Sequence, residues 1–178
     1  MEASAQLNPF SYVILALVGR NGAGPHDLAR MMREGQSVWT AARSQYYAEP
    51  KRLERLGYLH ADKQPGRTTE RTHYTLTEKG TTALRDWLAE PTRYSRIQSE
   101  PVLHLLAADQ VDDETTVASL QAMREELKDI AAQIDAAEAR AHEFPHRERY
   151  LRIQHTFMRA MVEAHEELIA RVEEELGR

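Results

Sequence analysis

The chain has 178 residues, no cysteine and a net charge of −5. This length accommodates one ordinary domain or a small domain with an extension, and the lack of cysteine excludes disulfides, thiolate metal sites and a cysteine nucleophile. The amino-terminal apolar run of about ten residues is too short to span a membrane and no basic stretch precedes it. We therefore expect neither a signal peptide nor a membrane anchor, and a cytoplasmic protein.

The charge is unevenly distributed along the chain. Residues 1–90 hold 12 basic and 10 acidic side chains, whereas residues 91–178 hold 11 and 18. This division is typical of a polyanion-binding module joined to a region that does not contact the polyanion, although two solvated surfaces would give the same counts. We predict two domains, 1–91 and 92–178, and expect only the first to meet a polyanion.

The first two predicted helices are short and amphipathic. Asn8 is a favourable N-cap and Pro9 suits the first helical position, and the apolar residues that follow recur at helical spacing. A second helix is predicted to begin at Pro25 and to end before Gly35. Each therefore presents one apolar face for packing.

A third helix is predicted at residues 44–56, where Ser44 is the expected cap and Gly57 the stop. Pro50 lies inside this helix. Because proline removes one helical N–H donor and crowds the preceding turn, it costs about 3 kcal/mol in a straight helix. We therefore predict a helix that is kinked, or that restarts near Glu49.

The period of the pattern changes to two after the third helix. Residues 58–62 and 72–76 are predicted strands, and the polar loop 63–71 between them holds a Pro-Gly turn and two arginines. A further helix is predicted between Thr77 and Pro91. Three helices, a hairpin and a linking helix are the order of a winged helix-turn-helix, whose third helix enters the major groove of DNA.

The second domain is predicted to be helical throughout. A short apolar helix at 100–109 precedes a long segment, from Leu120 to Phe144, whose apolar residues alternate at spacings of three and four. This alternation is typical of a coiled-coil seam. A last helix after Pro145 carries a broad apolar stripe. The fold class predicted for the whole chain is mostly α with a small β-hairpin wing.

Two long apolar helices with few elements to cover them would expose a large apolar surface in a monomer. We therefore predict that the second domain is an antiparallel helical or coiled-coil pair and that it forms a homodimer. The residues assigned to this dimer contact are Leu120, Leu127, Ile130, Ile134, Phe157 and Met161.

The motifs of the first domain, taken together and in order, resemble the PadR family of bacterial transcriptional regulators. They are NPFSYVILALVG (8–19), DLAR (27–30), W-x-A-A-R-S-Q-Y-Y (39–47), KRLERLGYL (51–59), QPGRTTERTHY (64–74) and TLTEKGTTALRDWLAEP (75–91). The resemblance implies a dimeric repressor that binds an inverted-repeat operator in double-stranded DNA and is released by a small molecule. In the usual family pattern a proline directly follows the tyrosine of the third helix, whereas Ala48 stands there and Pro50 comes two residues later.

The residues assigned to the DNA surface fall on the third helix and on the loop between the strands. Ser44 and Gln45, at the start of the helix, are expected near base edges, and Lys51 and Arg52 near phosphates. An arginine of the loop can enter a minor groove or clamp a phosphate. The complete set is Ser44, Gln45, Tyr47, Lys51, Arg52, Arg55, Arg67, Thr68 and Arg71. For each of them a solvated or packed surface residue is the alternative.

No enzyme or metal signature is found. His142 and His146 have a spacing that metal ligands use, but Pro145 interrupts the helix that would align the two rings. The sequence from His165 begins like a zinc-protease motif and has Ile169 where a second histidine is required. Since a nucleophile elbow and a glycine-rich phosphate loop are also missing, we predict no catalytic site, no metal and no cofactor.

Trp39 and Trp87 are expected to anchor the core. In dimers of the PadR family a cavity between domains can take a flat aromatic effector, so the resemblance also implies that these two residues, Trp87 above all, could line such a site. The function predicted first is DNA-binding transcriptional regulation. The alternative is a winged-helix module that binds another protein and no DNA, and the salt dependence of binding separates the two.

Overall fold

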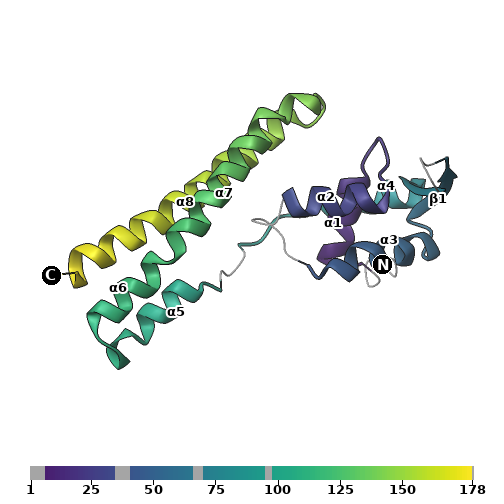
Figure 1. Cartoon of the computed structure of the whole chain (residues 1–178). Helices are drawn as coiled ribbons and strands as arrows, with labels where there is room; N and C mark the ends of the chain where they lie inside the picture. The colour runs from purple at the N-terminus through teal and green to yellow at the C-terminus, as the bar shows by residue number, and fades with distance from the viewer. Residues whose placement is uncertain (1–6, 35–40, 66–69, 95–97, 178) are drawn as a thin grey trace. The chain divides into compact units, whose positions relative to one another are not determined.

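The protein folds as two compact units, Met1–Tyr94 and Ser95–Arg178, called here the N-terminal unit and the C-terminal unit (Figure 1). The boundary between them lies just beyond the one expected at residue 91. The structure is a computed structural model, and the residues that it describes are 7–34, 41–65, 70–94 and 98–177.

The N-terminal unit is a small helical domain with one hairpin. Its elements are α1 (Pro9–Val18), α2 (Pro25–Glu34), α3 (Arg43–Arg55), β1 (Leu59–Gln64), β2 (Arg71–Leu76) and α4 (Glu78–Ala89). The two strands are antiparallel and pair from Leu59 opposite Leu76 to Gln64 opposite Arg71. The predicted winged helix-turn-helix is therefore confirmed, with strands slightly longer than the alternating pattern indicated.

The start of α1 follows from its local sequence. The Asn8 side chain accepts a hydrogen bond from the Ser11 backbone N–H at 2.9 Å, and Pro9 occupies the first turn. Both features satisfy or remove N–H groups that have no partner inside a helix. The predicted cap of this helix is therefore confirmed.

Side chains from the first three helices meet in the core of the N-terminal unit. Ile14 and Leu15 of α1, Leu28 of α2 and Leu53 of α3 are fully buried, and so is Tyr58 just after α3. Burial of each such side chain stabilises a fold by about 1.5–3 kcal/mol relative to leaving it exposed. This shared core holds one side of α3 against α1 and α2.

The end of α3 is joined to the start of α4. Gly57 stops α3 with φ = 77°, a left-handed conformation that favours glycine. The Thr77 hydroxyl donates to the Gly57 carbonyl at 2.7 Å, and the same oxygen accepts from the Gly80 N–H at 3.0 Å and so caps α4. One side chain thus ties two helix ends together.

Two more contacts tighten this joint. Lys79 Nζ donates to the Leu56 carbonyl at 2.8 Å. A Cβ atom at Gly80 would collide with the Tyr58 carbonyl oxygen, so only glycine allows α4 to pack this closely.

The C-terminal unit consists of helices. They are α5 (Glu100–Leu106), the short 3₁₀ helix η2 (Ala108–Gln110), α6 (Asp113–Gln121), α7 (Met123–Ala139), the 3₁₀ helix η3 (Ala141–Glu143) and α8 (Glu148–Leu176). The chain reverses between α7 and α8, and these two helices lie antiparallel along each other (Figure 1). The predicted antiparallel pair is confirmed, although the first of its helices is divided at Ala122 into α6 and α7.

The apolar seam of α6 and α7 packs inside the chain. Leu120, Leu127 and Ile134, which are seven residues apart, are almost fully buried, and Ile130 is half-buried beside them. Their cluster partners on α8 are Met158, Val162, Ile169 and Val172. The assignment of Leu120, Leu127, Ile130 and Ile134 to a dimer contact is therefore corrected: the hairpin of α7 and α8 uses this seam for its own core.

Charged side chains fix the register of the α7–α8 hairpin. Arg124 donates to both carboxylate oxygens of Glu173, at 2.8 and 2.7 Å. Further along the pair, Arg159 of α8 binds Asp135 at 2.7 Å and Glu138 at 2.8 Å. Two-point contacts of this kind are geometrically specific, so they oppose sliding of one helix along the other.

A second apolar face of α8 remains exposed. Tyr150, Ile153 and Phe157, spaced by three and four residues, are 58, 69 and 64% exposed. We call these three residues the α8 ridge. The apolar stripe predicted for this helix therefore divides into two faces, of which only one is used within the chain.

Candidate nucleic-acid interface

Helix α3 has one buried and one exposed face. Tyr46, Pro50 and Leu53 lie in the interior. On the other side, six residues are exposed: Ser44, Gln45, Ala48, Lys51, Glu54 and Arg55. Since residues three and four apart share a helix face, the exposed side offers a continuous strip of small, polar and charged side chains, in which two cations accompany one carboxylate.

The cations of this strip are available to an external anion. Among the described residues, neither Lys51 nor Arg55 has an ion-pair partner, and both are exposed. On the hairpin, Arg71 is exposed at the start of β2. The other two assigned loop residues, Arg67 and Thr68, lie outside the described residues.

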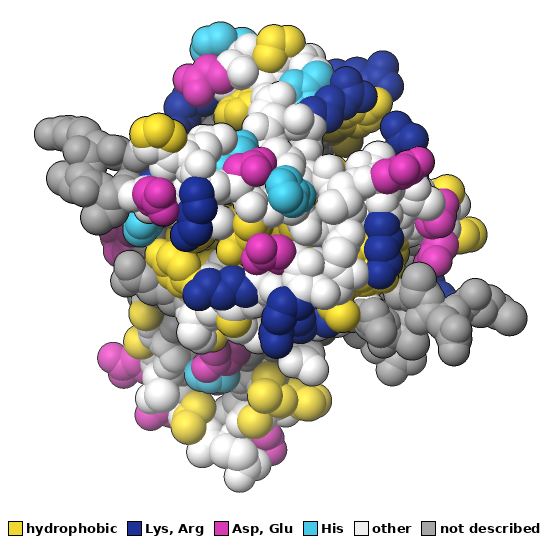
Figure 2. Space-filling model, turned by 90° about the vertical axis from the view of Figure 1, so that its right-hand side faces the viewer, with side chains coloured by type: hydrophobic (Ala, Val, Ile, Leu, Met, Phe, Trp, Pro, Cys, Tyr) yellow, Lys and Arg dark blue, Asp and Glu magenta, His cyan; other side chains and the backbone are white. Residues whose placement is uncertain are grey.

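Basic side chains do not form one continuous patch on the face shown in Figure 2. There, Lys and Arg side chains are spread among Asp, Glu and His side chains. This agrees with the small excess of 12 basic over 10 acidic residues in positions 1–90. Affinity for a polyanion at this surface would therefore depend on a few individual cations.

The start of α3 differs from the prediction. Ala42, and not Ser44, is the N-cap residue, and its N–H donates to the Gln45 side-chain oxygen at 3.3 Å. Ser44 lies inside the first turn with its side chain exposed. The helix starts earlier because Gln45 reaches back to the cap, and this leaves the Ser44 hydroxyl free for an external partner.

One of the two effects expected of Pro50, the restart of the helix, is corrected, while the kink stays a prediction. α3 runs as one helix from Arg43 to Arg55 with Pro50 inside it, so the restart near Glu49 is not observed. The pyrrolidine ring is fully buried. Its apolar packing offsets part of the energy of the lost backbone hydrogen bond.

Arg52 does not belong to the exposed strip. Its Nε donates to Glu49 Oε2 at 2.8 Å and its Nη2 to Glu49 Oε1 at 2.6 Å. The same Nη2 donates to the Ser11 hydroxyl of α1 at 2.9 Å. The Arg52 guanidinium thus takes part in a contact between α1 and α3, and its assignment to phosphate stays a prediction.

Glu49 and Ser11 were not identified from the sequence. Burial raises the pKa of the Glu49 carboxyl, but hydrogen bonds from Arg52 and Ser11 and the Arg52 charge outweigh burial and lower the pKa below 4.5. Glu49 therefore stays ionised in the interior. The spacing of Glu49 and Arg52 by three residues could have indicated their pairing. Ser11 stands three residues after Asn8, as in a capping box, but nothing in the local sequence indicates its contact with α3.

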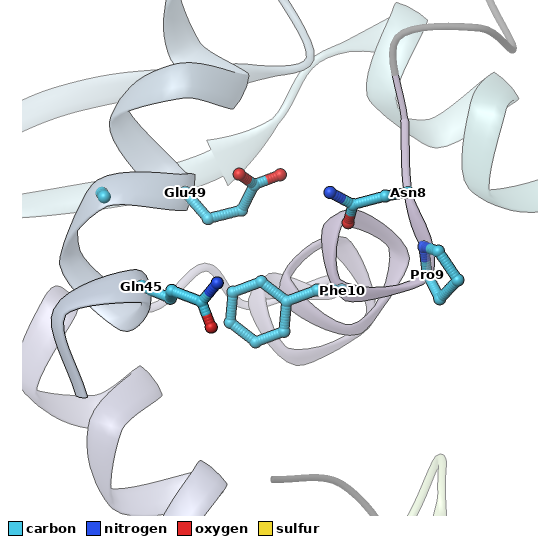
Figure 3. Close-up of a pocket in the computed structure, with 6 residues that line it drawn as sticks. Asn8, Pro9, Phe10, Gln45 and Glu49 are labelled. Atoms are coloured by element: carbon cyan, nitrogen blue, oxygen red, sulfur yellow. The ribbon is translucent and has the colours of Figure 1, made fainter. Parts of the chain in front are cut away.

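A shallow open depression of about 390 Å³ lies beside this contact. It is lined by the start of α1, through Asn8, Pro9 and Phe10, and by Gln45, Ala48 and Glu49 of α3. Figure 3 shows the side chains of Gln45 and Phe10 side by side and Glu49 on the same side of α3 as Gln45. The exposed strip of α3 therefore adjoins the amino end of α1.

The aromatic candidates occupy different positions. Tyr47 is half-buried and lies edge-on to His26, with ring centroids 6.3 Å apart. Trp87 is 38% exposed and stacks on Tyr12, with centroids 4.6 Å apart and an angle of 7° between the planes. Trp87 is thus a partly open packing residue on α4, while Trp39 lies outside the described residues.

The described part of the chain contains no group of three or more His, Cys, Asp or Glu side chains placed to hold a metal ion. No helix there combines the length and the apolar character needed to cross a membrane.

Comparisons with known proteins identify the fold. No protein-family model and no curated protein sequence matches the chain. Among solved structures, PadR from Bacillus subtilis in complex with operator DNA matches with a TM-score of 0.70 and 20% identity, over 93% of this chain and 99% of that one. PadR of the same organism in complex with p-coumaric acid matches with a TM-score of 0.65 and 20% identity, over 94 and 98%.

A third match is the PadR-like transcriptional regulator BC1756 from Bacillus cereus. Its TM-score is 0.71 and its identity 15%, over 92% of this chain and 95% of that one. Since the matches extend over both units, the chain has the fold of the PadR regulators from α1 to α8.

Proposed function

We propose that this chain is a dimeric DNA-binding transcriptional regulator of the PadR type that acts by binding and not by catalysis. The observation that carries the proposal is α3, a helix held by the core on one side and exposing small and polar side chains, the cations Lys51 and Arg55 and one carboxylate, Glu54, on the other. A helix of this kind, third in a winged helix-turn-helix, can enter the major groove. The fold likeness to a structure that holds operator DNA supports this use of α3.

The exposed strip of α3 divides into two proposed roles. Ser44 and Gln45 lie in the first turn of the helix, where side chains commonly reach base edges. Lys51 and Arg55 lie further along and would neutralise phosphates, as would Arg71 of the hairpin. The proposed DNA surface also includes Tyr47, Arg67 and Thr68.

The α8 ridge supports a homodimer. Three large apolar side chains are exposed in a row on one helix face, and a contiguous exposed apolar patch of this kind often marks a protein–protein contact. Next to the ridge, α5 and α8 line an apolar groove with Val102, Leu103, Leu106, Met161 and Leu168 among its residues. We propose that a second copy of the chain covers these surfaces and so presents two α3 helices to an inverted-repeat operator.

The proposed mode of regulation is repression that a small aromatic molecule relieves. One matched structure, that of Bacillus subtilis PadR, holds p-coumaric acid. In this chain Trp87 has a partly exposed indole ring that a flat ligand could stack on. Isothermal titration of the dimer with hydroxycinnamic acids, followed by Trp fluorescence, tests this part separately from DNA binding.

The decisive experiment is retention of DNA fragments from the source genome by the purified protein. A retained fragment is then titrated at several salt concentrations, and the logarithm of affinity should fall linearly with the logarithm of salt. Lys51→Ala should flatten this slope by about 0.9 per contact in each subunit.

The control is Lys128→Ala, which removes an exposed lysine from the C-terminal unit and should leave the slope unchanged. Binding that is insensitive to salt, or no retained fragment, would contradict the DNA proposal. It would favour the alternative, a winged-helix module that binds another protein.

A further inference from the structure

The contact between α1 and α3 contains a buried polar cluster formed by Ser11, Glu49 and Arg52. Ser11 is fully buried and Glu49 is 9% exposed, while the Arg52 side chain is 32% exposed. Buried charges are normally paired and hydrogen-bonded, because an isolated charge in the interior is strongly unfavourable. In this cluster the carboxylate meets both an ionic partner and a hydroxyl.

The Ser11 hydroxyl uses its full hydrogen-bonding capacity. It donates to Glu49 Oε1 at 2.7 Å, and it accepts from Arg52 Nη2 at 2.9 Å and from the Asn8 backbone N–H at 3.1 Å. A hydroxyl has one donor and two acceptor sites. Asn8 Oδ1, at 3.1 Å, is a second and longer acceptor for the same hydroxyl. The contacts of Ser11 with Glu49 and Arg52 connect α1 to α3, and a rotation of α3 about its axis would break them.

The cluster also spans the position in α3 where Pro50 removes a backbone hydrogen bond. Pro50 lacks the N–H that would bond to the preceding turn, and Glu49 and Arg52 lie on either side of it. Their ion pair, with two hydrogen bonds of 2.8 and 2.6 Å, closes the helical turn that contains Pro50. Ser11 then attaches this turn to α1.

We propose that Ser11, Glu49 and Arg52 form a brace that positions α3: it fixes the rotation of the helix relative to α1 and thereby determines which of its side chains face the bases. The brace is a set of positioning residues and does not itself touch DNA. This inference rests on the proposed DNA-binding function. Apolar packing alone tolerates small rotations, whereas charge-assisted hydrogen bonds with defined geometry do not.

The brace and a phosphate contact predict different results for Arg52. If Arg52 belongs to the brace, Arg52→Ala leaves the slope of log affinity against log salt as in the wild type. The same variant lowers the ratio of operator to scrambled-duplex affinity by about tenfold or more, because a misplaced helix loses its base contacts. Lys51→Ala is the matched control on the same helix. It flattens the slope by about 0.9 per contact in each subunit and preserves the ratio.

Ser11→Ala is the milder variant, because it keeps the Glu49–Arg52 ion pair and removes only the attachment to α1. It lowers the operator-to-scrambled ratio with no change of slope. If Arg52→Ala flattens the slope as Lys51→Ala does, or if neither Ser11→Ala nor Arg52→Ala changes the ratio, the proposal is overturned.

Amide hydrogen exchange of α3 in the free protein gives a readout that does not need DNA. Ser11→Ala is expected to accelerate exchange in α3 and to leave α8 unchanged. Unchanged exchange in α3 overturns the brace itself. A wild-type protein that binds no duplex overturns the proposed function instead, and the positioning role with it.

Discussion

The two units use polar and apolar side chains in opposite ways. The N-terminal unit buries a charged cluster and exposes polar and cationic residues on α3, whereas the C-terminal unit places its ion pairs on the surface and leaves an apolar ridge uncovered. Among the described residues, three exposed large apolar side chains belong to the N-terminal unit and eight to the C-terminal unit. The three are Trp87, Leu88 and Tyr94, all on α4 or just after it.

This difference indicates what each unit lacks. An exposed polar and cationic surface is already solvated and can exchange water for a polyanion. An exposed apolar surface is stabilised when another apolar surface covers it. We therefore expect the N-terminal unit to need no further apolar contact for its stability. The exposed apolar surface of the C-terminal unit should be covered only in the proposed dimer.

The largest effect should come from breaking the proposed dimer through the α8 ridge. Replacing Ile153 and Phe157 together by Asp puts charges on this apolar surface without touching the seam between α7 and α8. The variant should be monomeric in light scattering. It should bind an operator with two half-sites about 10²–10⁴-fold more weakly, because the two subunits no longer bind as one linked molecule. Arg171→Ala, an exposed change elsewhere on α8, is the control. A double variant that remains dimeric would contradict the role of the ridge.

The next effect tests whether the two units are stabilised separately. Leu53 and Ile169 are fully buried, one in each unit, and truncation of such a residue to Ala usually lowers the free energy of unfolding by about 2–5 kcal/mol. Leu53→Ala should destabilise only the N-terminal unit. Ile169→Ala should destabilise only the C-terminal one.

Tryptophan fluorescence follows the N-terminal unit, because both tryptophans, Trp39 and Trp87, belong to residues 1–94. Far-UV circular dichroism reports on the helices of both units. Ile169→Ala should therefore shift the circular dichroism transition and leave the fluorescence transition unchanged. If Ile169→Ala shifts both signals equally, the two units unfold together.

A smaller effect is expected at His155 in the C-terminal unit. This side chain is 6% exposed, and its Nδ1 has no hydrogen-bond partner among the described residues. Replacing a buried polar group without a partner by an apolar one of similar size removes its desolvation cost. His155→Leu should therefore raise the stability of the helical unit by about 1 kcal/mol, measured by urea unfolding. A decrease would indicate that Nδ1 has a partner in the dimer.

The smallest effect is a difference in acid sensitivity between the units. Burial lowers the pKa of His155 below 6.5, with Arg159 acting in the same direction and Glu138 opposing them. Because the unfolded chain then binds the proton more readily, the contribution of His155 is fully present above pH 6.5 and is lost as the pH falls below it.

The Glu49 carboxyl of the N-terminal unit should lose its contribution to stability at a lower pH than His155 does. Its folded-state pKa lies below 4.5, so its contribution is retained above pH 4.5 and lost only as the pH falls further. On acidification the C-terminal unit should weaken first. Thermal unfolding measured between pH 7 and pH 4 shows which unit loses stability first. His155→Leu is the control, because this variant lacks the loss of stability that protonation of His155 causes. The reverse order would contradict it.

Features that depend on neighbouring residues could be predicted from the sequence. The Asn8 cap, the Gly57 stop and the change from helical to alternating period each involve residues a few positions apart, and the structure agrees with all three. The heptad spacing of α6 and α7 likewise identified the buried seam. What it could not show is whether the partner of that seam is another chain or α8 of the same chain.

Features that depend on contacts between distant residues could not be predicted. Ser11 and Arg52 are 41 positions apart, so the sequence alone assigned Arg52 to the outer face of α3. The position of Pro50 was identified, but its buried environment was not. The start of α3 was predicted too late for a local reason, because a glutamine in the first turn can serve as a cap partner in place of a serine.

Thr77, Lys79 and Gly80 couple the position of α4 to the carboxyl end of α3. All three residues contact residues 56–58, directly after α3. At Gly80 the two backbones are in direct contact, so no flexible side chain lies between them to absorb a displacement. A tilt of α4 would therefore be transmitted directly to the end of α3.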